Sequence, residues 1–551
     1  MRGTLSERIL AHSRETPDRL AIRLLHGQRP EQAITYGHLL EESLRYAGRL
    51  EQSGVKPGSV VLIIHPHGAD LVFGFFGTLL AGAIPSILPY PTEKLDPVHY
   101  RQSMEALFQL IKPRAVLTYS GLGETLGSLL DPHHASLLLP QLGRGALGVP
   151  ASMSPRDIAL LQHSSGTTGL QKGVALSHTA IFNQLQSYAE AIDFSAKDVV
   201  VSWLPLYHDM GLIAGFLLPV LWGVPLVLMS PLEWVRAPQM LLQAVSRFRG
   251  TLSWLPNFAY NFCARKIHAS ALAGVDLSCW RAVINCSEPV SVRSHEVFLE
   301  RFAPWGFRRE ALAASYAMAE NVFAVTQGGI GEPLTIDEVD PKGLATTGRA
   351  EPASPGVRLL SSGRTLRNVE VKIVDANGDS LPSRQVGEIA LRSDCMLTGY
   401  YLRPDLTEKA IRDGWYFTGD LGYRVENDLF VTGRSKDLII VGGRNIYPAD
   451  LEEIVNEVEG VHPGRVVAFG VPNAELETED VAVVAEVDTE DEAARRQILE
   501  AIRTSIARQT DCVARHIHLV DSRWLIKTSS GKISRHANRE KLLTEKGLAT
   551  S

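Results

Sequence analysis

The sequence predicts an α/β protein with several subdomains, and three observations support this. At 551 residues the chain is too long for one ordinary domain. Near the N-terminus, patterns typical of strand, helix and strand follow in quick succession, which favours a parallel sheet covered by helices. Residues 369–420 instead show short alternating strands around a turn at Asn377-Gly378, which predicts a β-rich subdomain.

The N-terminal elements follow from hydrophobic periodicity and turn residues. Residues 33–60 are expected to form a helix that ends at the turn Lys56-Pro57-Gly58. A buried strand over 60–64, a buried helix over 71–83 and strands at 87–88 and 116–118 follow. Residues 124–153 are less regular. These elements predict a parallel α/β layer.

Composition limits the class of protein. Hydrophobic residues make up 45% and charged residues 21%, as in ordinary soluble enzymes. A net charge of -6 gives no footprint for nucleic acid and no polybasic membrane anchor. The five cysteines include no CxxC pair, which predicts free thiols in a reducing cytoplasm. The polar N-terminus shows no secretory signal, and the apolar runs 71–89 and 212–229 are broken by Gly and Pro, so we expect buried core elements, not membrane spans.

The most informative stretch is LLQHSSGTTGLQKGVALSH, residues 160–178, which follows a short apolar strand. Its glycines let backbone N–H groups turn to one point, and its hydroxyls and a lysine add donors and a cation there. This is a cradle for the phosphates of a nucleotide, although an ordinary Ser/Gly loop is the alternative. Gln171 and Gly173 exclude the common P-loop pattern. The residues of the predicted cradle are Ser164, Ser165, Gly166, Thr167, Thr168, Gly169 and Lys172.

Further strands each end in a polar motif. After a helix over 179–191, we expect strands at 199–205, 251–254 and 280–285, with a helix over 240–249. The motifs that follow are HDMGL at 208–212, PNFAY at 256–260, CSEP at 286–289 and SYAMAE at 315–320. A polar residue at a strand end is usually only an edge residue, so the order and spacing of these motifs carry the inference.

In this order the motifs resemble those of the adenylate-forming superfamily, which includes acyl-CoA synthetases, acyl-AMP ligases, amino-acid adenylation domains and firefly luciferase. HDMGL and PNFAY are typical of its fatty acyl-AMP ligases. The resemblance implies binding of ATP and Mg²⁺ and a carboxylic acid substrate. It assigns nucleotide contacts to Cys286, Ser287, Glu288, Tyr316 and Ala317, magnesium to Glu320 and Thr168, and an acyl pocket to His208, Asp209, Trp254, Asn257 and Met318. Catalytic roles fall on Lys532, His208 and Glu320.

The C-terminal part completes the resemblance. An acidic residue is suited to bridging ribose hydroxyls, and the resemblance gives that role to Asp420, with Arg434 as a second contact and Lys436 as the hinge. It implies an N-terminal adenylation domain over 1–435 and a small mobile α+β domain over 436–551, in which the loop 527–533 carries Lys532. Strands at 465–471, 481–487 and 516–520 and a helix over 492–508 are expected in the small domain.

The implied reaction brings a carboxylate to the α-phosphate of ATP and yields acyl-AMP and pyrophosphate. The repulsion of two like charges is only ~1 kcal/mol at ~4 Å in water but is larger in a drier cleft, so cations are needed to offset it.

His163, Gln171 and Ala317 depart from the usual family residues but keep the donor set. Trp254-Leu255 replaces a pair that is usually small, which predicts a short, medium or functionalised acid, although a tryptophan turned into the core is the alternative.

The acyl acceptor depends on residues 328–356, which are rich in Gly and Pro and lack helical periodicity. Long segments of this kind are often functional, although a tolerated surface insertion is the alternative. The segment resembles the insertion that marks fatty acyl-AMP ligases, which implies transfer to a separate acyl carrier protein rather than to CoA. The other hypotheses are an acyl-CoA synthetase, an amino-acid adenylation enzyme with Asp209 as the grip for an amine, and a nucleotide-binding regulator without turnover.

Overall fold

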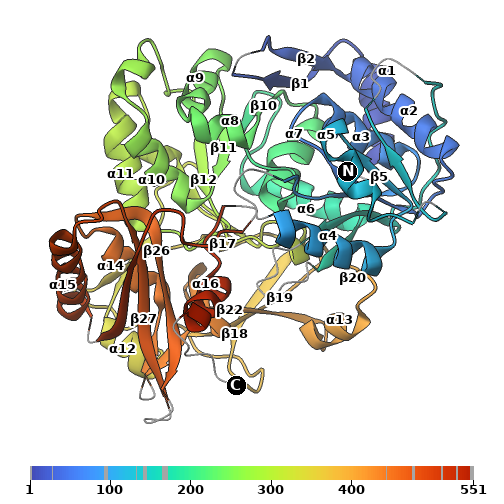
Figure 1. The fold of residues 1–551 in the computed structure, drawn as a ribbon. Helices are drawn as coiled ribbons and strands as arrows, with labels where there is room; N and C mark the ends of the chain where they lie inside the picture. The colour runs from blue at the N-terminus through green and yellow to red at the C-terminus, as the bar shows by residue number, and fades with distance from the viewer. Residues whose placement is uncertain are drawn as a thin grey trace. The chain divides into compact units, whose positions relative to one another are not determined.

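The computed structural model describes residues 3–27, 29–91, 97–131, 133–140, 145–163, 172–441, 444–473, 478–510, 513–528 and 531–545. The chain forms two compact units (Figure 1). Unit 1 consists of Met1–Leu334, Gly363–Glu370 and Arg392–Arg412, and unit 2 of Thr335–Ser362, Val371–Leu391 and Asp413–Ser551. Unit 2 therefore holds the whole predicted mobile domain together with three earlier segments. The hinge at Lys436 stays a prediction.

The main sheet of unit 1 has the strand order β13-β12-β11-β9-β10-β1-β2. All of these strands pair in parallel except the edge strand β2, which is antiparallel to β1. Their bounds are β1 (Leu20–Leu25), β2 (Gln32–Thr35), β9 (Val200–Ser202), β10 (Leu226–Met229), β11 (Leu252–Leu255), β12 (Ala282–Asn285) and β13 (Leu312–Ala314). The carboxyl ends of β9, β11, β12 and β13 thus meet at one edge, where α/β sheets bind ligands.

A second parallel sheet, of order β4-β3-β5-β6, confirms the α/β layer expected near the N-terminus. Its strands are β3 (Val60–Ile64), β4 (Ile84–Ile87), β5 (Ala115–Thr118) and β6 (Ser136–Leu138), and the helices of this region are α1 (Leu5–Glu15), α2 (Tyr36–Gln52), α3 (Ala69–Leu80), α4 (Pro97–Ile111) and α5 (Ser120–Gly127). Strand β3 is buried along its whole length, as strands of covered parallel sheets are.

The helix expected over 33–60 was too long at both ends. Residues up to Thr35 pair with β1 as strand β2, and the Thr35 side chain caps α2 by accepting from His38 N. A hydroxyl cap favours a helix start directly after it. The helix ends at Gln52, ahead of the Pro-Gly turn.

A third sheet of unit 1 joins distant parts of the sequence. Its order is β20-β8-β7, from β7 (Ile158–His163), β8 (Gly173–Ser177) and β20 (Gly399–Tyr400). The antiparallel pairing of β8 with β20 brings residues near 400 beside the residues that follow the predicted phosphate loop. Besides short 3-10 helices, unit 1 also contains α6 (His178–Ala191), the π-helix η1 (Met210–Leu217), α7 (Leu218–Trp222), α8 (Pro231–Arg236), α9 (Gln239–Phe248), α10 (Asn257–Lys266), α11 (Val292–Phe302) and α13 (Pro404–Ala410).

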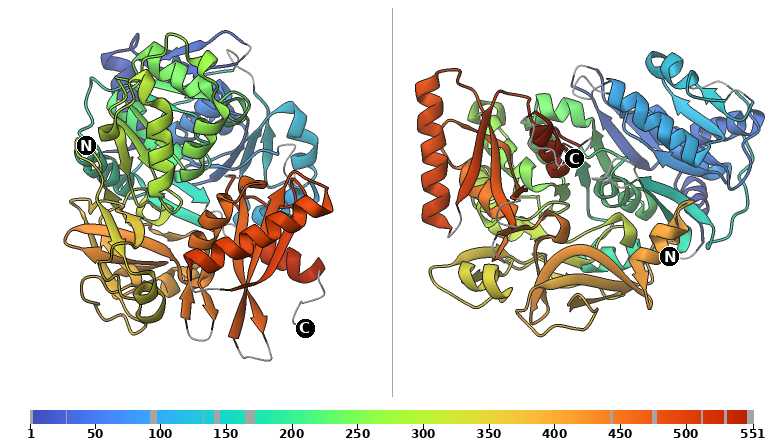
Figure 2. Two further views of the ribbon diagram at one scale, coloured as in Figure 1. Left: turned by 90° about the vertical axis from the view of Figure 1, so that its left-hand side faces the viewer. Right: turned by 60° about the horizontal axis from the view of Figure 1, so that its bottom comes forward.

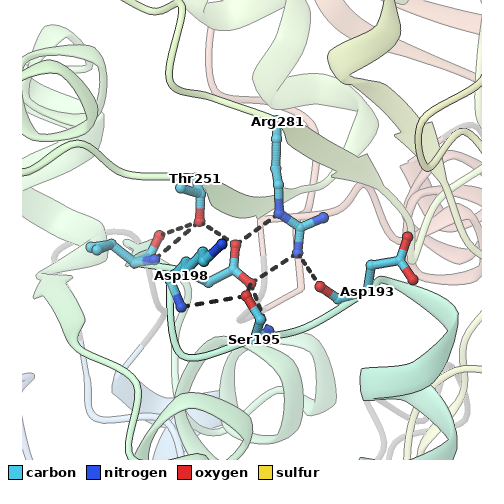
Figure 3. Close-up of polar contacts among 7 residues, drawn as sticks. Asp193, Ser195, Asp198, Thr251 and Arg281 are labelled. Atoms are coloured by element: carbon cyan, nitrogen blue, oxygen red, sulfur yellow. Dashed lines mark hydrogen bonds and ion pairs between the residues drawn. The ribbon is translucent and has the colours of Figure 1, made fainter.

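An ion pair fastens the amino ends of the main-sheet strands, opposite the edge that carries the motifs (Figure 3). Arg281, directly before β12, donates through Nε to Asp198 Oδ1 at 2.7 Å and through Nη2 to Asp198 Oδ2 at 3.0 Å. Thr251, directly before β11, donates to Asp198 Oδ1 at 2.7 Å. Asp198 is 3% exposed, and bidentate Arg–carboxylate pairs are the strong ones. The network stabilises the amino end of the sheet, opposite the edge that carries the motifs.

Unit 2 contains an antiparallel β-rich part and a small α+β part. The first has β22 (Trp415–Val425) between β19 (Gly387–Ser393) and β23 (Asp428–Arg434), with β18 (Val369–Val374) beyond β19. The second has the sheet β26-β27-β28, from β26 (Val461–Asn473), β27 (Thr478–Val487) and β28 (Ala514–Val520), with α14 (Pro448–Asn456), α15 (Glu492–Gln509) and α16 (Arg535–Glu545). Helices α14 and α15 cover one face of this sheet and α16 covers the other (Figure 2). The predicted fold class is confirmed.

The segment expected to be irregular around 328–356 contains regular structure. It forms β15 (Ile336–Val339), α12 (Pro341–Thr347) and β16 (Val357–Leu360), and the two strands pair antiparallel. Asp340 caps α12 by accepting from Lys342 N and Gly343 N. The segment buries Val339 and Leu344 against Tyr423, Phe430 and Tyr447. Local periodicity could not show this, because the partners that order the segment lie far along the chain.

The two long apolar runs belong to the core. Residues 71–89 fall in α3 and β4, and residues 212–229 fall in η1, α7 and β10. Within the described ranges no helix is both long and apolar enough to cross a membrane. Within the described ranges, Cys263, Cys279, Cys286 and Cys395 are not joined in disulfides, as the cysteine spacing predicts, and Cys512 lies outside these ranges.

Buried histidines predict that acid destabilises the protein. Burial lowers the pKa of His67, His163 and His178 to about 4 and that of His295 to about 3. In the unfolded chain the pKa of histidine is ~6.5. Between the lowered pKa values of the folded state and this unfolded value, the folded chain binds fewer protons than the unfolded chain. Stability that is present above pH ~6.5 is therefore lost as the pH falls, with a slope of up to ~1.4 kcal/mol per pH unit for each group.

Urea unfolding between pH ~7.5 and ~4.5 measures this slope. In the native protein, His178 Nδ1 accepts a hydrogen bond from Leu5 N at 3.2 Å. The variant His178→Asn keeps an acceptor at this position but cannot titrate. It should therefore reduce the slope of stability against pH. The exposed His133 supplies the control His133→Asn, which should leave it unchanged. Equal slopes in all three proteins would contradict the prediction.

Candidate active site

Polar loops leave four neighbouring parallel strands at the same edge of the main sheet. The loop after β9 carries His208 and Asp209, and the loop after β11 carries Asn257. The loop after β12 carries Cys286, Ser287 and Glu288, and the loop after β13 carries Tyr316, Ala317, Met318 and Glu320. The parallel pairing thus gathers the predicted residues of four motifs at one end of unit 1.

The HDMGL loop leads into a π-helix that the sequence did not predict. His208 Nδ1 lies 2.6 Å from Asp209 Oδ1, and the same oxygen accepts from Met210 N at 2.7 Å. A Cβ atom at Gly211 would clash with the carbonyl oxygen of Pro205, so this turn requires glycine. π-Helical turns are uncommon and are often found at functional sites.

The loops after β11 and β12 brace one another. Asn257 Oδ1 accepts from Asn285 Nδ2 at 2.9 Å and from Ser291 N at 3.2 Å. In return, Glu288 Oε2 accepts from Phe258 N at 3.0 Å, at the N-terminus of α10, where a carboxylate is favoured. Ser287, in the loop after β12, has a φ of 70°, a conformation that is uncommon outside glycine. The predicted nucleotide loop is therefore held in one shape, and Asn257 helps to hold it.

Trp254 lies in the core. Its side chain is 1% exposed, and its Nε1 donates to the hydroxyl of Tyr188 at 2.7 Å. That hydroxyl donates to Gln327 Oε1 at 3.0 Å, and Gln327 Nε2 donates to Ala314 O, at the end of β13, at 3.2 Å. Sequence reasoning missed Tyr188, because it lies 66 residues before Trp254 and carries no local signal. A role for Trp254 in the acyl pocket stays a prediction.

The loop after β13 presents Glu320. Tyr316 N donates to Thr326 Oγ1 at 3.1 Å, and Met318 N donates to Phe323 O at 2.8 Å. Val322 has a φ of 63°, which is a strained value for a β-branched residue. The carboxylate of Glu320 accepts from the hydroxyl of Tyr400 at 2.8 Å. The loop thus holds one carboxylate in a defined position.

Lys172 also contacts the side chain of Tyr400. Its Nζ is 5.0 Å from the centroid of the Tyr400 ring, within the range of a cation–π contact. The remaining residues of the predicted phosphate cradle, 164–169, lie outside the described residues. The structure therefore brings together one cation and one carboxylate that the sequence assigned to phosphate and magnesium.

Unit 2 holds the other predicted residues. Asp420 and Arg434 are partners across β22 and β23, and Arg434 Nε lies 2.9 Å from Asp420 Oδ1. Lys436 lies in the short 3-10 helix Ser435–Asp437. Lys532 lies on a tight loop that is closed by a bridge between Lys527 and Ile533. Ser529 and Ser530 lie outside the described residues.

Glu320 is the described residue that fits the predicted magnesium site. Glu320 offers a hard oxygen ligand, and Mg²⁺ is usually held by one or two carboxylates together with substrate phosphates. The described part of the chain contains no group of three or more His, Cys, Asp or Glu side chains that could hold a metal ion. Thr168 lies outside the described residues, so its predicted role as a magnesium ligand stays a prediction.

Comparison with known proteins shows the family of the chain. The family model described as AMP-binding enzyme matches residues 10–401. A Caulobacter vibrioides protein with the provisional name acyl-CoA synthetase is 32% identical, over 92% of this chain and 89% of its own. Medium-chain-fatty-acid–[acyl-carrier-protein] ligase JamA of Moorena producens is 30% identical, over 94% and 91%.

The fold comparison points in the same direction. A structure from a study of fatty acyl-adenylate ligases of E. coli and L. pneumophila superposes with a TM-score of 0.91 at 27% identity, covering 100% of this chain and 99% of that chain. The family match extends over more than half of the chain, and the relatives are covered almost from end to end. The chain therefore belongs to the AMP-binding enzyme family of adenylate-forming ligases, and within it the chain is similar to the fatty acyl-AMP ligases.

Proposed function

We propose that this ligase converts a fatty or functionalised carboxylic acid to acyl-AMP and then transfers the acyl group to the phosphopantetheine thiol of a separate acyl carrier protein. ATP-dependent adenylation of a carboxylic acid follows from the family. The acid and the acceptor are the new parts of the proposal. The observation that carries the choice of acceptor is the folded segment Thr335–Ser362 of unit 2.

Each charged residue has a task in this reaction. The acid carboxylate attacks the α-phosphorus, the bond to the bridging oxygen of pyrophosphate breaks, and charge accumulates on the phosphate oxygens. Lys172 and Lys532 would offset this charge, and Asp420 with Arg434 would hold the ribose. Magnesium bound through Glu320 would supply further compensation of phosphate charge. Such preorganised charges are usually the largest contribution to catalysis.

The acceptor argument starts from Asp337 in the folded segment. Its carboxylate accepts from Arg384 Nη1 at 3.0 Å and from the Tyr423 hydroxyl at 2.9 Å. The segment also packs, through Val339 and Leu344, on Tyr447, which follows the predicted hinge. Because the folded segment contacts a residue after the predicted hinge, we infer that it restricts the movement of the C-terminal residues. A restriction of this kind would disfavour free CoA as the acyl acceptor.

Two other functions receive less support. An amino-acid adenylation enzyme would need Asp209 for the substrate amine, but this carboxylate already bonds His208 and Met210 N. An acyl-CoA synthetase shares the adenylation site, and the name of the Caulobacter vibrioides relative belongs to that class. The acceptor therefore has to be decided by measurement.

The experiment measures pyrophosphate release with ATP and a panel of carboxylic acids, and then acyl transfer to a holo carrier protein and to CoA. We expect release with medium-chain or functionalised acids, transfer to the carrier protein and little acyl-CoA. In the variant Asp337→Asn the segment is loosened, and acyl-CoA formation should rise by about tenfold, which corresponds to ~1.4 kcal/mol.

The matched control is Glu351→Gln, because Glu351 is on the same segment in an exposed pair with Arg349. This variant should leave acyl-CoA formation unchanged. If no acid supports pyrophosphate release, the catalytic proposal fails. If the intact chain makes acyl-CoA as fast as acyl-AMP, adenylation stands and the carrier-protein proposal fails.

A further inference from the structure

Tyr400 touches two charged residues of unit 1, Glu320 and Lys172, which are predicted to serve magnesium and phosphate. Its hydroxyl donates to Glu320 Oε1 at 2.8 Å, and the centroid of its ring is 5.0 Å from Lys172 Nζ. Tyr400 is 5% exposed, whereas Glu320 and Lys172 are partly exposed. The tyrosine therefore shields one side of each charge from water, and polar interactions are stronger where water is excluded. One side chain thus joins the predicted phosphate cation to the predicted magnesium carboxylate.

The backbone around Tyr400 is built to hold it there. On one side, Leu397 N donates to Glu320 O at 2.8 Å. On the other side, Tyr401 N donates to Gly173 O at 2.7 Å, and Tyr400 lies opposite Val174 in the pairing of β20 with β8. Residues 397–401 therefore connect the loop of Glu320 to the strand that directly follows Lys172. The position of Tyr400 relative to both charges is fixed by main-chain hydrogen bonds.

We propose that Tyr400 is a positioning residue that orients Glu320 for Mg²⁺ and Lys172 for the phosphates, an inference that depends on the proposed adenylation. A hydroxyl that donates to one carboxylate oxygen fixes the rotation of the carboxylate plane. The ring face restrains the flexible lysine side chain near the place where the phosphates bind. Partners that orient metal ligands typically affect metal affinity by ~10–100-fold when removed.

The two contacts can be separated by substitution. Tyr400→Phe keeps the ring and removes the hydroxyl, whereas Tyr400→Leu removes both. Tyr401→Phe is the matched control, because it removes a hydroxyl from the adjacent residue of the same segment. The readout is ATP binding by calorimetry, with Mg²⁺ and with EDTA, and thermal unfolding of each variant without nucleotide.

For Tyr400→Phe we expect the gain in ATP affinity on adding Mg²⁺ to fall by about tenfold, with binding in EDTA unchanged. For Tyr400→Leu we expect binding in EDTA to weaken as well, by roughly 2–10-fold, because the cation–π contact is lost. Tyr401→Phe should match the wild type in both conditions.

The outcomes separate the inference from the proposed function. If the wild type does not bind ATP, the proposed function fails and the inference fails with it. If the wild type binds and Tyr400→Phe keeps the full effect of Mg²⁺, only the inference is overturned. Equal weakening in both conditions, together with a lower unfolding temperature, would show a merely structural role and would also overturn it.

Discussion

Replacement of Lys532 with alanine is expected to slow acyl-adenylate formation by ~10²–10³-fold, the usual cost of losing one charge-stabilising donor. Hydrogen bonds of the backbone and of Asn538 help to hold the loop that carries Lys532. Thr528 N donates to Lys532 O at 2.7 Å through the backbone, and the buried Asn538 exchanges hydrogen bonds with the backbone of Ile526 at 2.8 and 2.9 Å. The variant should therefore fold normally.

The second half-reaction distinguishes a catalytic role from a general defect. Because Lys532 acts on the phosphate, Lys532→Ala should still transfer the acyl group from a supplied acyl-adenylate to the carrier protein. Lys527→Ala removes a lysine from the other side of the same loop and should keep normal adenylation. Both half-reactions can be followed by mass spectrometry of the acyl carrier protein and by pyrophosphate release. Normal adenylation by Lys532→Ala would refute the assignment.

Replacement of Arg535 with methionine is expected to destabilise unit 2 by roughly 2–3 kcal/mol, less than the ~3–5 kcal/mol typical of a fully buried ion pair, because the side chains of Arg535 and Glu452 remain 23% and 19% exposed. Arg535 Nη2 donates to Glu452 Oε1 at 2.8 Å and to Oε2 at 2.9 Å. Its Nη1 donates to Asp437 at 2.8 Å, and its Nε donates to Ala468 O at 2.9 Å. The guanidinium thus joins α16, α14, β26 and the residue after the predicted hinge.

Hydrogen exchange of β26 and β27 in the full chain measures this loss of stability. Arg535→Met with Glu452→Gln should recover part of it, since the unpaired carboxylate is then neutral. Arg496→Met is the control, because its pair with Glu492 is exposed on both sides and such pairs contribute little. If Arg535→Met and Arg496→Met destabilise equally, the Arg535 cluster does not stabilise unit 2.

Local patterns were sufficient for the strands that carry the motifs. Strands β9, β11 and β12 were expected near their observed positions because short apolar runs ending in Pro, Asn or Ser are encoded within a few residues. Their parallel order, observed in the main sheet, then places HDMGL, PNFAY and CSEP at one edge. The start of α2 was misplaced because a strand and a helix adjoin at Thr35 without a break in hydrophobicity.

The fold class, the family and the order of the predicted site motifs could be inferred from the amino-acid sequence, because each of these is encoded in short stretches of neighbouring residues. The contacts between distant residues became visible in the folded chain alone. Tyr400 meets Glu320 across 80 residues, Arg535 meets Asp437 across 98, and Asp337 meets Tyr423 across 86. Contacts at such separations arise from strand pairing and packing of the whole chain, so no local pattern of apolar and polar residues specifies them.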